Sequence, residues 1–330
     1  HGDDFGVVAS LKNIEKFKKA LEEVFEIKQV GLIGFDSHLD KEVKILNRIV
    51  RVNTSEDRME IEADTKHVEM ILEELEMKTC KQIGTPRDKE DLGGDKDEKL
   101  VAAEATRFRS CLMRLSYLSQ DRVDLSESVK ILARSMANPT MKAMKGLKRA
   151  ARYLKGKQRC VLLYPRQSAK EAAIMVFTDS DWAGDKGSRK STSGMAVLRG
   201  RHLLRHGSTM QSVITLSSCE AEYYAMTKGA AAGLGVQSLF ADWGLDCKLE
   251  IYCDSSSALA FCQRRGIGKQ RHIQTRFLWL QERVAARHLR VLKVGTDDNP
   301  ADLFTKQLEV KKMRKFERML GQIDYGGAGV

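Results

Sequence analysis

Two aspartates each follow an apolar run that we predict to be a strand. Asp179 follows residues 174–178, and Asp254 follows residues 249–253, whose apolar side chains alternate with period two. If these strands are neighbours in one sheet, their ends bring the two carboxylates together. The sequence therefore predicts an acidic cluster at one end of a sheet.

Two further acids lie near predicted helix starts and extend this cluster to four. Glu222 lies near the start of a long predicted helix, and Asp302 follows Asn299-Pro300, a candidate N-cap and first-turn proline. Four carboxylates in one place repel one another unless cations neutralise them. Two magnesium ions about 4 Å apart are the arrangement that activates water in phosphodiester hydrolysis. We therefore predict a site for two Mg²⁺ ions, with Mn²⁺ as an alternative.

Two of the four acids have a neighbouring acid that could take their place in the cluster. Asp179 and Asp181 are two residues apart, so both point to the same side of a strand and periodicity does not choose between them. Glu220 and Glu222 are about 200° apart on a helix, so only one of them can face the cluster. Taken singly, each acid is more often a helix cap or a surface charge than a metal ligand, and the ordered set of four favours the metal site.

Four short runs carry most of the information about function. In their order and spacing they resemble the ribonuclease H region of copia-type LTR retrotransposon Pol polyproteins. The resemblance implies a ribonuclease H-like α/β fold, with a mixed sheet flanked by helices. It also implies two-metal hydrolysis of the RNA strand of an RNA–DNA hybrid. The runs are FTDSDWAG (177–184), RKSTSG (189–194), LSSCEAEY (216–223) and NPADLFTK (299–306).

The same resemblance assigns roles to the acids. It favours Asp179 over Asp181 as the ligand that would bridge both metal ions. Glu222, which a small residue follows three positions later, and Asp254 would complete one metal site, and Asp302 would complete the other. The protein's own contribution would then be positioning and charge neutralisation.

The N-terminal residues resemble another part of the same polyproteins. The run His-Gly-Asp-Asp at residues 1–4 is similar to the paired aspartates of a reverse transcriptase palm, where Asp3 and Asp4 would be metal ligands. Gly84-Thr-Pro86 resembles the end of a thumb helix. The strand that would supply a third carboxylate lies upstream of His1, so we expect no polymerase activity from this chain. We interpret the chain as a piece of a longer product, with the rest of the Pol polyprotein as its partner.

These resemblances, together with composition, divide the chain into four regions. Residues 88–104 are rich in charge and lack an apolar period, which favours a linker. The predicted regions are a reverse transcriptase palm and thumb remnant (1–87), a charged linker (88–104), a helical connection (105–157) and a ribonuclease H-like domain (158–325).

Periodicity predicts the elements that must position the acids. Before the ribonuclease H-like region we expect a hairpin within 44–52 and a helix at 64–77 with Asp64 as its N-cap. Residues 161–164 are expected to begin that region. Its further predicted strands are 174–179, 194–198, 212–215, 249–254 and 289–294, and its predicted helices are one beginning at Ser217, then 255–264, 274–288 and 300–320.

The charge distribution indicates a polyanionic partner, which the resemblance specifies as an RNA–DNA hybrid. The chain of 330 residues has a net charge of +11 and a pI near 9.2. No acid occurs between Glu127 and Glu171, a stretch dense in Lys and Arg. Four of these cations recur every three or four residues on one face of a predicted helix, which suits a phosphate backbone, although a solvated charged face is an equal alternative. They are Lys142, Lys145, Arg149 and Arg152.

Two shorter segments are further candidates for contacts to nucleic acid. His272 lies in a basic His-Ile run that resembles one common in the copia group; a structural or surface histidine is the alternative. A basic, hydroxyl-rich turn suits phosphate contacts, although a plain hairpin turn explains it equally well. Its residues are Arg189, Lys190, Ser191 and Thr192.

Cysteine spacing and hydropathy favour an intracellular protein, in the cytoplasm or the nucleus. The seven cysteines form no Cys-x-x-Cys pair and have no companion histidine spacing, which argues against structural zinc and a disulfide framework. No apolar run approaches the roughly 20 residues needed to cross a bilayer. We therefore predict no membrane partner.

Two alternatives to a hybrid-cleaving ribonuclease stay open. One is a catalytically inactive or domesticated remnant that binds nucleic acid, against which the four intact acids speak. The other is a nuclease or integrase of the same fold that acts on DNA. The four runs, and the lack of a His/Cys zinc cluster, speak against that second alternative.

Overall fold

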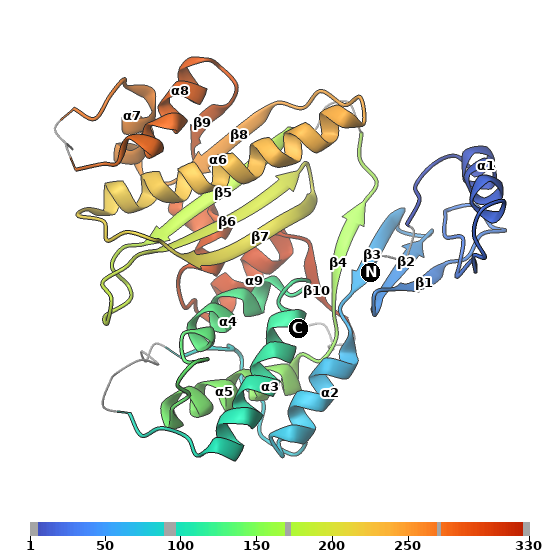
Figure 1. Cartoon of the computed structure of the whole chain (residues 1–330), viewed down its shortest axis with the longest axis horizontal. Helices are drawn as coiled ribbons and strands as arrows, with labels where there is room; N and C mark the ends of the chain where they lie inside the picture. Colours follow the sequence, from blue (N-terminus) through green and yellow to red (C-terminus); the bar gives the residue numbers. More distant parts are fainter. Residues whose placement is uncertain (1–5, 89–96, 169–172, 269–271, 326–330) are drawn as a thin grey trace.

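The computed structural model describes residues 6–88, 97–168, 173–268 and 272–325. Within these ranges the strands form two five-stranded sheets, with a group of helices packed against both (Figure 1). The first sheet has the order β1-β2-β3-β4-β10 and the second the order β7-β6-β5-β8-β9. The strands are β1 (Glu42–Ile45), β2 (Arg48–Asn53), β3 (Arg58–Glu62), β4 (Cys160–Pro165), β5 (Ile174–Asp181), β6 (Thr192–Arg199), β7 (His202–Met210), β8 (Leu249–Cys253), β9 (Arg290–Lys293) and β10 (Gln322–Asp324).

The helices fall into an N-terminal helix, a central group and a set around the second sheet. None of the helices within the described ranges is long and apolar enough to cross a membrane. The α-helices are α1 (Leu11–Glu22), α2 (Thr65–Glu74), α3 (Ala102–Leu118), α4 (Ser126–Ala133), α5 (Met141–Gly156), α6 (Ser218–Asp242), α7 (Ser256–Gln263), α8 (Trp279–Ala285) and α9 (Val310–Met319). The 3-10 helices are η1 (Val123–Leu125), η2 (Thr275–Leu278), η3 (Thr296–Asp298) and η4 (Pro300–Phe304).

The second sheet is mixed, with β5 at its centre. Strands β5, β6 and β7 are antiparallel, whereas β8 pairs with β5 in parallel and β9 pairs with β8 in parallel. The long helix α6 crosses one face of this sheet (Figure 1). Its close approach depends on Gly229 and Gly233, because a Cβ at either position would lie within 3 Å of side chains on β5 or β8. The predicted mixed α/β fold class is confirmed.

Several local predictions are confirmed by the geometry. The first hairpin turns at Leu46-Asn47, both with positive φ as a type I′ turn requires. Asp64 caps α2 by accepting a hydrogen bond from the Lys66 N–H (2.9 Å), and Ser217 caps α6 through the Glu220 N–H (3.2 Å).

Two predicted elements are wrong. The third strand of the second sheet is β7 and not residues 212–215, because β7 is a polar, half-exposed strand that pairing with β6 stabilises and apolar periodicity does not reveal. The predicted helix 300–320 is broken into η4 and α9. The Thr305 hydroxyl bonds to Asp179, and Leu308 is buried, so the intervening residues serve side-chain contacts instead of continuing the helix.

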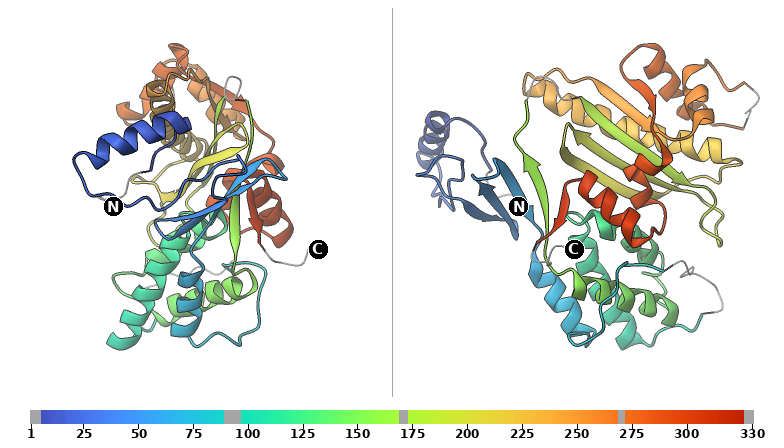
Figure 2. Two further views of the ribbon diagram at one scale, coloured as in Figure 1. Left: turned by 90° about the vertical axis from the view of Figure 1, so that its right-hand side faces the viewer. Right: turned by 180° about the vertical axis from the view of Figure 1, so that it is seen from behind.

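Strand β4 lies in the first sheet and not in the second. It pairs with β3 on one side and with the C-terminal strand β10 on the other. The regions on either side of residue 158 therefore share this sheet. Figure 2, seen from behind, shows α9 and β10 between the second sheet and the group α2–α5.

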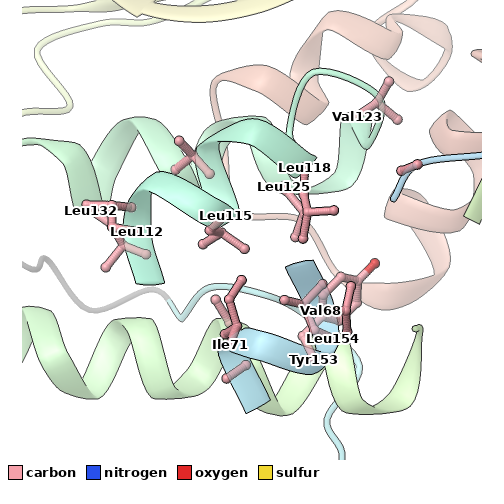
Figure 3. Packing of buried hydrophobic residues seen from close by; sticks show 14 of the residues in the cluster. Val68, Ile71, Leu112, Leu115, Leu118, Val123, Leu125, Leu132, Tyr153 and Leu154 are labelled. Carbon is pink, nitrogen blue, oxygen red and sulfur yellow. The ribbon is translucent and has the colours of Figure 1, made fainter. Parts of the chain in front are cut away.

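One hydrophobic core joins the helical group to the underside of the second sheet. Helices α2, α3 and α5 contribute Val68, Ile71, Leu112, Leu115 and Leu154 (Figure 3). Residues of β6, η4 and α9 belong to the same core. A second core fills the space between α6, the other sheet face, and α7 and α8. The helical group and the second sheet are thus packed as one body.

Candidate active site

The four predicted acids converge at the carboxyl end of β5 and β8. These strands are adjacent and in register from Ile174 opposite Leu249 to Phe177 opposite Tyr252, so Asp179 and Asp254 follow at the same end. The N-terminal turns of α6 and the short helix η4 supply the other two acids. Asn299, which caps η4 through the Ala301 N–H, also donates from its amide to the Thr178 carbonyl (2.9 Å), so this cap fixes η4 against β5.

Asp179 and Asp302 share a lysine. Lys306 Nζ lies 3.1 Å from Asp179 Oδ1 and 2.9 Å from Asp302 Oδ1. The other oxygen of Asp302 accepts from Lys312 Nζ (2.9 Å), and the other oxygen of Asp179 accepts from the Thr305 hydroxyl. Both carboxylates are almost fully buried. Cationic side chains thus balance part of the negative charge in this half of the site.

Glu222 and Asp254 form the other half of the site. One oxygen of Glu222 accepts a hydrogen bond from the Ser180 N–H (3.2 Å), directly beside Asp179. Carboxylate oxygens of Glu222 and Asp254 and the Cys253 sulfur all lie within 4.8 Å of one another. Burial and the Glu222 charge raise the pKa of the Cys253 thiol well above its usual range, so the thiol stays protonated and donates toward Glu222.

Burial and mutual repulsion make Asp179 and Glu222 reluctant to ionise. The pKa of Asp179 is raised to about 7, because burial and the charge of Asp302 outweigh the opposing effect of Lys306. Burial, with the charges of Asp179 and Asp254, raises the pKa of Glu222 to about 8. Hard carboxylate oxygens with excess negative charge are the ligands that Mg²⁺ and Mn²⁺ prefer, so the residues fit such ions.

The neighbouring acids occupy different surroundings. Glu220 is buried away from Asp179; it accepts from the Leu216 N–H (2.8 Å) and contacts His272 Nε2 (2.9 Å). His272 therefore lies against the start of α6 and pairs with Glu220. Asp181 is half-buried at the end of β5, on the same side as Asp179; burial raises its pKa, which Lys130 opposes.

The four cations predicted on one face of α5 form two pairs with different surroundings, Arg149 with Arg152 and Lys142 with Lys145. Arg149 forms an ion pair with Asp88 (3.1 Å) and donates to the Thr85 hydroxyl (3.1 Å), and Arg152 donates to the Lys81 carbonyl (2.9 Å). These two arginines hold the segment before the linker against the helix. Lys142 and Lys145 line a cavity beside them.

In the basic turn at residues 189–192, both hydroxyl groups form hydrogen bonds within the protein. Ser191 is buried, and its hydroxyl bonds to the Thr215 hydroxyl (2.8 Å) and accepts from the Ala183 N–H (3.0 Å). The Thr192 hydroxyl accepts from Lys130 Nζ (2.8 Å). Arg189 is exposed and Lys190 half-buried, so only these two side chains present charge to solvent. Asp3 and Asp4 lie outside the described residues.

Sequence reasoning missed the cations of the site. Lys306 and Lys312 contact the acids directly, and Lys130 stands beside Asp181. Lys306 follows Asp302 by four residues, a spacing that places both side chains on one helical face and is visible in the sequence. Lys130 comes from α4, and no signal in the sequence links that helix to the acids.

Protein families, sequence relatives and solved structures offer comparisons with this chain. No protein-family model matches the chain. The retrovirus-related Pol polyprotein from transposon TNT 1-94 of Nicotiana tabacum is 28% identical over 336 residues, covering 97% of this chain and 24% of that relative. The retrovirus-related Pol polyprotein from transposon RE1 of Arabidopsis thaliana is 30% identical over 221 residues, covering 66% of this chain and 15% of that relative. The solved structure of LC11-RNase H1, isolated from compost, aligns with 40% of this chain and 92% of that chain, at 18% identity and a TM-score of 0.30.

The order of the second sheet, with its crossing helix and convergent acids, defines a ribonuclease H-like α/β protein. The sequence relationships are more specific than this class. The predicted resemblance is confirmed, because the sequence relatives of the chain are copia-type, retrovirus-related Pol polyproteins from plant transposons. The chain spans 24% and 15% of the lengths of the two relatives described above.

Proposed function

We propose that the chain is the ribonuclease H part of a retrotransposon Pol polyprotein and hydrolyses the RNA strand of RNA–DNA hybrids. The observation that carries this proposal is the convergence of Asp179, Glu222, Asp254 and Asp302 at one end of two adjacent parallel strands. Sequence similarity to retrovirus-related Pol polyproteins supports the choice of substrate. In such a reaction, water would attack the phosphorus and the bond from phosphorus to the 3′ oxygen would break. The products would carry a 3′-hydroxyl and a 5′-phosphate.

The four carboxylates would hold two divalent ions. Such ions, when bound, lower the pKa of water and stabilise charge on phosphate oxygens. The chain's own residues set the conditions for this. Asp179 and Glu222 must lose their protons, Thr305 orients one oxygen of Asp179, and the Ser180 N–H orients Glu222. Lys306 keeps Asp302 and Asp179 together.

The regions outside this site receive roles by the same proposal. Residues 1–87 would be the remnant of a reverse transcriptase palm and thumb, in which Asp3 and Asp4 were metal ligands. Residues 88–104 would be a linker, 105–157 a connection and 158–325 the ribonuclease region. The remainder of such a polyprotein would be the partner.

Cleavage of a labelled RNA–DNA hybrid tests the proposal. We expect cutting of the RNA strand with magnesium or manganese and none in chelator, because the carboxylates themselves offer no nucleophile. Calcium should support binding but little cleavage, since its looser geometry holds the reacting oxygens poorly in line. Cleavage by purified protein in the absence of metal would contradict the two-metal proposal.

Substitution of Asp254 separates catalysis from binding. Asp254→Asn should abolish cleavage and leave the fold and the hybrid affinity largely intact, because it removes one ligand charge and keeps the shape. Asp181→Asn and Glu220→Gln are the matched controls and should be milder. If Asp181→Asn were as damaging as Asp179→Asn, then Asp181 would share the role that we assign to Asp179.

One observation favours a second candidate, a remnant that binds nucleic acid without cutting it. Lys306 and Lys312 already pair with Asp179 and Asp302, so two of the four charges are balanced without any metal ion. A remnant of this kind would bind the hybrid at the same place. Binding of the hybrid without cleavage, in magnesium and in manganese, would support this second candidate.

A further inference from the structure

A basic cavity of about 340 Å³ lies outside the second sheet, between α4, α5 and residues 86–88. Several cations line it, of which Arg87 and Lys148 were not among the residues predicted to bind nucleic acid. Among the described residues, the single carboxylate in the wall is that of Asp88, which is exposed and paired with Arg149. The cavity is therefore strongly positive. Its cations are Arg87, Lys142, Lys145, Lys148, Arg149 and Arg152.

Three buried donor atoms that belong to residues lining this cavity have no hydrogen-bond partner among the described residues. They are Nε of Arg87, Nε of Arg149 and Oγ of Ser128. Ser128 is only 3% exposed. A buried donor without a partner is destabilising unless a ligand or a water molecule satisfies it. Because all three belong to residues that line one cavity, they favour an acceptor-rich ligand there.

The chemistry of the wall matches a phosphate group. Arg87 pairs with Glu127, and Arg149 pairs with Asp88, so both guanidinium groups are held in place by contacts that leave their Nε atoms free to donate. Planar guanidinium groups suit the oxygens of a phosphate. Lys142, Lys145 and Lys148 follow at three-residue steps on α5, and none forms an ion pair with a carboxylate in the part of the chain that the structure describes.

The cavity adjoins the acidic cluster. A smaller cavity of about 20 Å³ shares Pro86, Arg87 and Ser128 with it. Lys306 and the carboxylates Asp124 and Glu127 also line this smaller cavity. Lys306 in turn contacts Asp179 and Asp302. A chain of contiguous residues therefore leads from the basic cavity to the proposed catalytic acids.

We propose that this cavity binds a backbone phosphate of the nucleic acid whose RNA strand lies at the acidic cluster. The inference rests on the proposed function, and it adds a contact from α4, α5 and Arg87 that the ribonuclease H-like sheet does not supply. The phosphate accepts hydrogen bonds from Arg87, Arg149 and Ser128, and the lysines neutralise its charge. The contact fixes the register of the strand against the acids.

The test is the affinity for a fluorescent RNA–DNA hybrid, measured by anisotropy over a range of salt with calcium in place of magnesium. The variant Lys142→Gln/Lys145→Gln/Lys148→Gln should bind the hybrid about tenfold more weakly. The slope of log affinity against log salt should decrease by about 0.7–0.9 for the lost phosphate contact. The matched control, Lys12→Gln/Lys16→Gln/Lys19→Gln on α1, removes the same charge and should change neither quantity appreciably.

Ser128→Ala separates ligand binding from folding. The hydroxyl has no partner among the described residues, so its removal should leave the melting temperature unchanged or higher while hybrid affinity falls several-fold. A structural role would give the opposite result, a lower melting temperature with unchanged affinity, and would overturn the proposal.

Inorganic phosphate distinguishes a backbone phosphate from a free anion. If millimolar phosphate stabilises the wild type but not the triple lysine variant, and that variant binds the hybrid normally, the cavity takes a free anion and the proposal is wrong. Unchanged hybrid affinity and salt slope without any phosphate effect would also overturn it. If the wild-type chain does not cut the hybrid but the triple variant still binds it more weakly, the phosphate-binding proposal stands and the proposed ribonuclease activity is wrong.

Discussion

At the scale of residues, the site is a balance between buried charge and its neutralisation. Asp179, Glu222 and Asp302 are all buried, and burial with mutual repulsion disfavours the ionised forms of Asp179 and Glu222. Lys306 and Lys312 compensate on one side, whereas described lysines or arginines make no ion pair with Glu222. The Glu222 side of the cluster is therefore the part whose charge would depend most on a bound cation, if the proposed ions bind.

This balance predicts a pH dependence of stability in chelator. The pKa values of Asp179 and Glu222 in the folded protein, about 7 and about 8, exceed their ordinary values of 3.8 and 4.5. The folded protein thus holds more protons than the unfolded chain between about pH 4 and 8, and the resulting stability is lost as pH rises through that window. Glu222→Gln should remove the part of this loss that is due to Glu222, on the order of 3 kcal/mol in the free energy of unfolding between pH 5 and 8.

Urea unfolding of wild type and Glu222→Gln at pH 5 and pH 8 measures this effect. Magnesium should restore wild-type stability more at pH 8 than at pH 5, since its binding requires deprotonated carboxylates. Parallel pH profiles for the two proteins in chelator would show that Glu222 is not protonated in the folded state.

At the scale of elements, α6 positions Glu222 only because the helix lies very close to β5. An added Cβ at Gly229 would lie 2.5 Å from Thr178 Cγ2 and 3.0 Å from Val176 Cγ1, and both neighbours are β-branched and buried. Such side chains have little freedom to move aside. The distance between helix and strand is therefore set by glycine.

Gly229→Ala tests this packing. The clash should outweigh the better helix propensity of alanine and lower the free energy of unfolding by about 1–3 kcal/mol. Gly235→Ala on the same helix is the matched control: nothing lies within 4 Å of its added Cβ, so it should stabilise by up to about 1 kcal/mol. Chemical denaturation gives both values, and equal effects of the two substitutions would contradict the close approach.

At the scale of the whole molecule, a buried ionic cluster joins the connecting helices to the C-terminal helix. Arg122 is fully buried and donates two hydrogen bonds to Asp124 (3.0 and 2.6 Å), which also accepts from the Tyr153 hydroxyl (2.6 Å). Lys157, at the end of α5, pairs with Glu317 of α9 (2.8 Å). The neighbouring cations hold the pKa of Asp124 well below its usual range.

Asp124→Asn should destabilise the whole chain by about 3–5 kcal/mol, because it leaves Arg122 buried without its carboxylate partner. The control is Asp121→Asn, which breaks a half-exposed pair with Arg48 and should cost less than about 1 kcal/mol. Thermal unfolding followed at once by far-ultraviolet circular dichroism and by loss of hybrid binding measures the effect. Separate transitions for helices and binding would show that the shared core does not couple them.

The sequence alone determined the local elements and the set of acids. Alternation and apolar runs identify β5 and β8, capping residues such as Ser217 and Asn299 mark helix starts, and both signals arise from contacts near in sequence. It also left Asp179 and Asp181 undecided on periodicity, because both lie on the same side of one strand.

The tertiary structure decided what depends on distant contacts. It placed β4 in the first sheet and made β7 the edge strand of the second, since pairing partners and not local preference select polar strands. It showed that the Thr192 hydroxyl is taken by Lys130, and that Lys306 lies between two acids. Such contacts follow from how β5, α4 and η4 pack together, and spacing along the chain does not encode that packing.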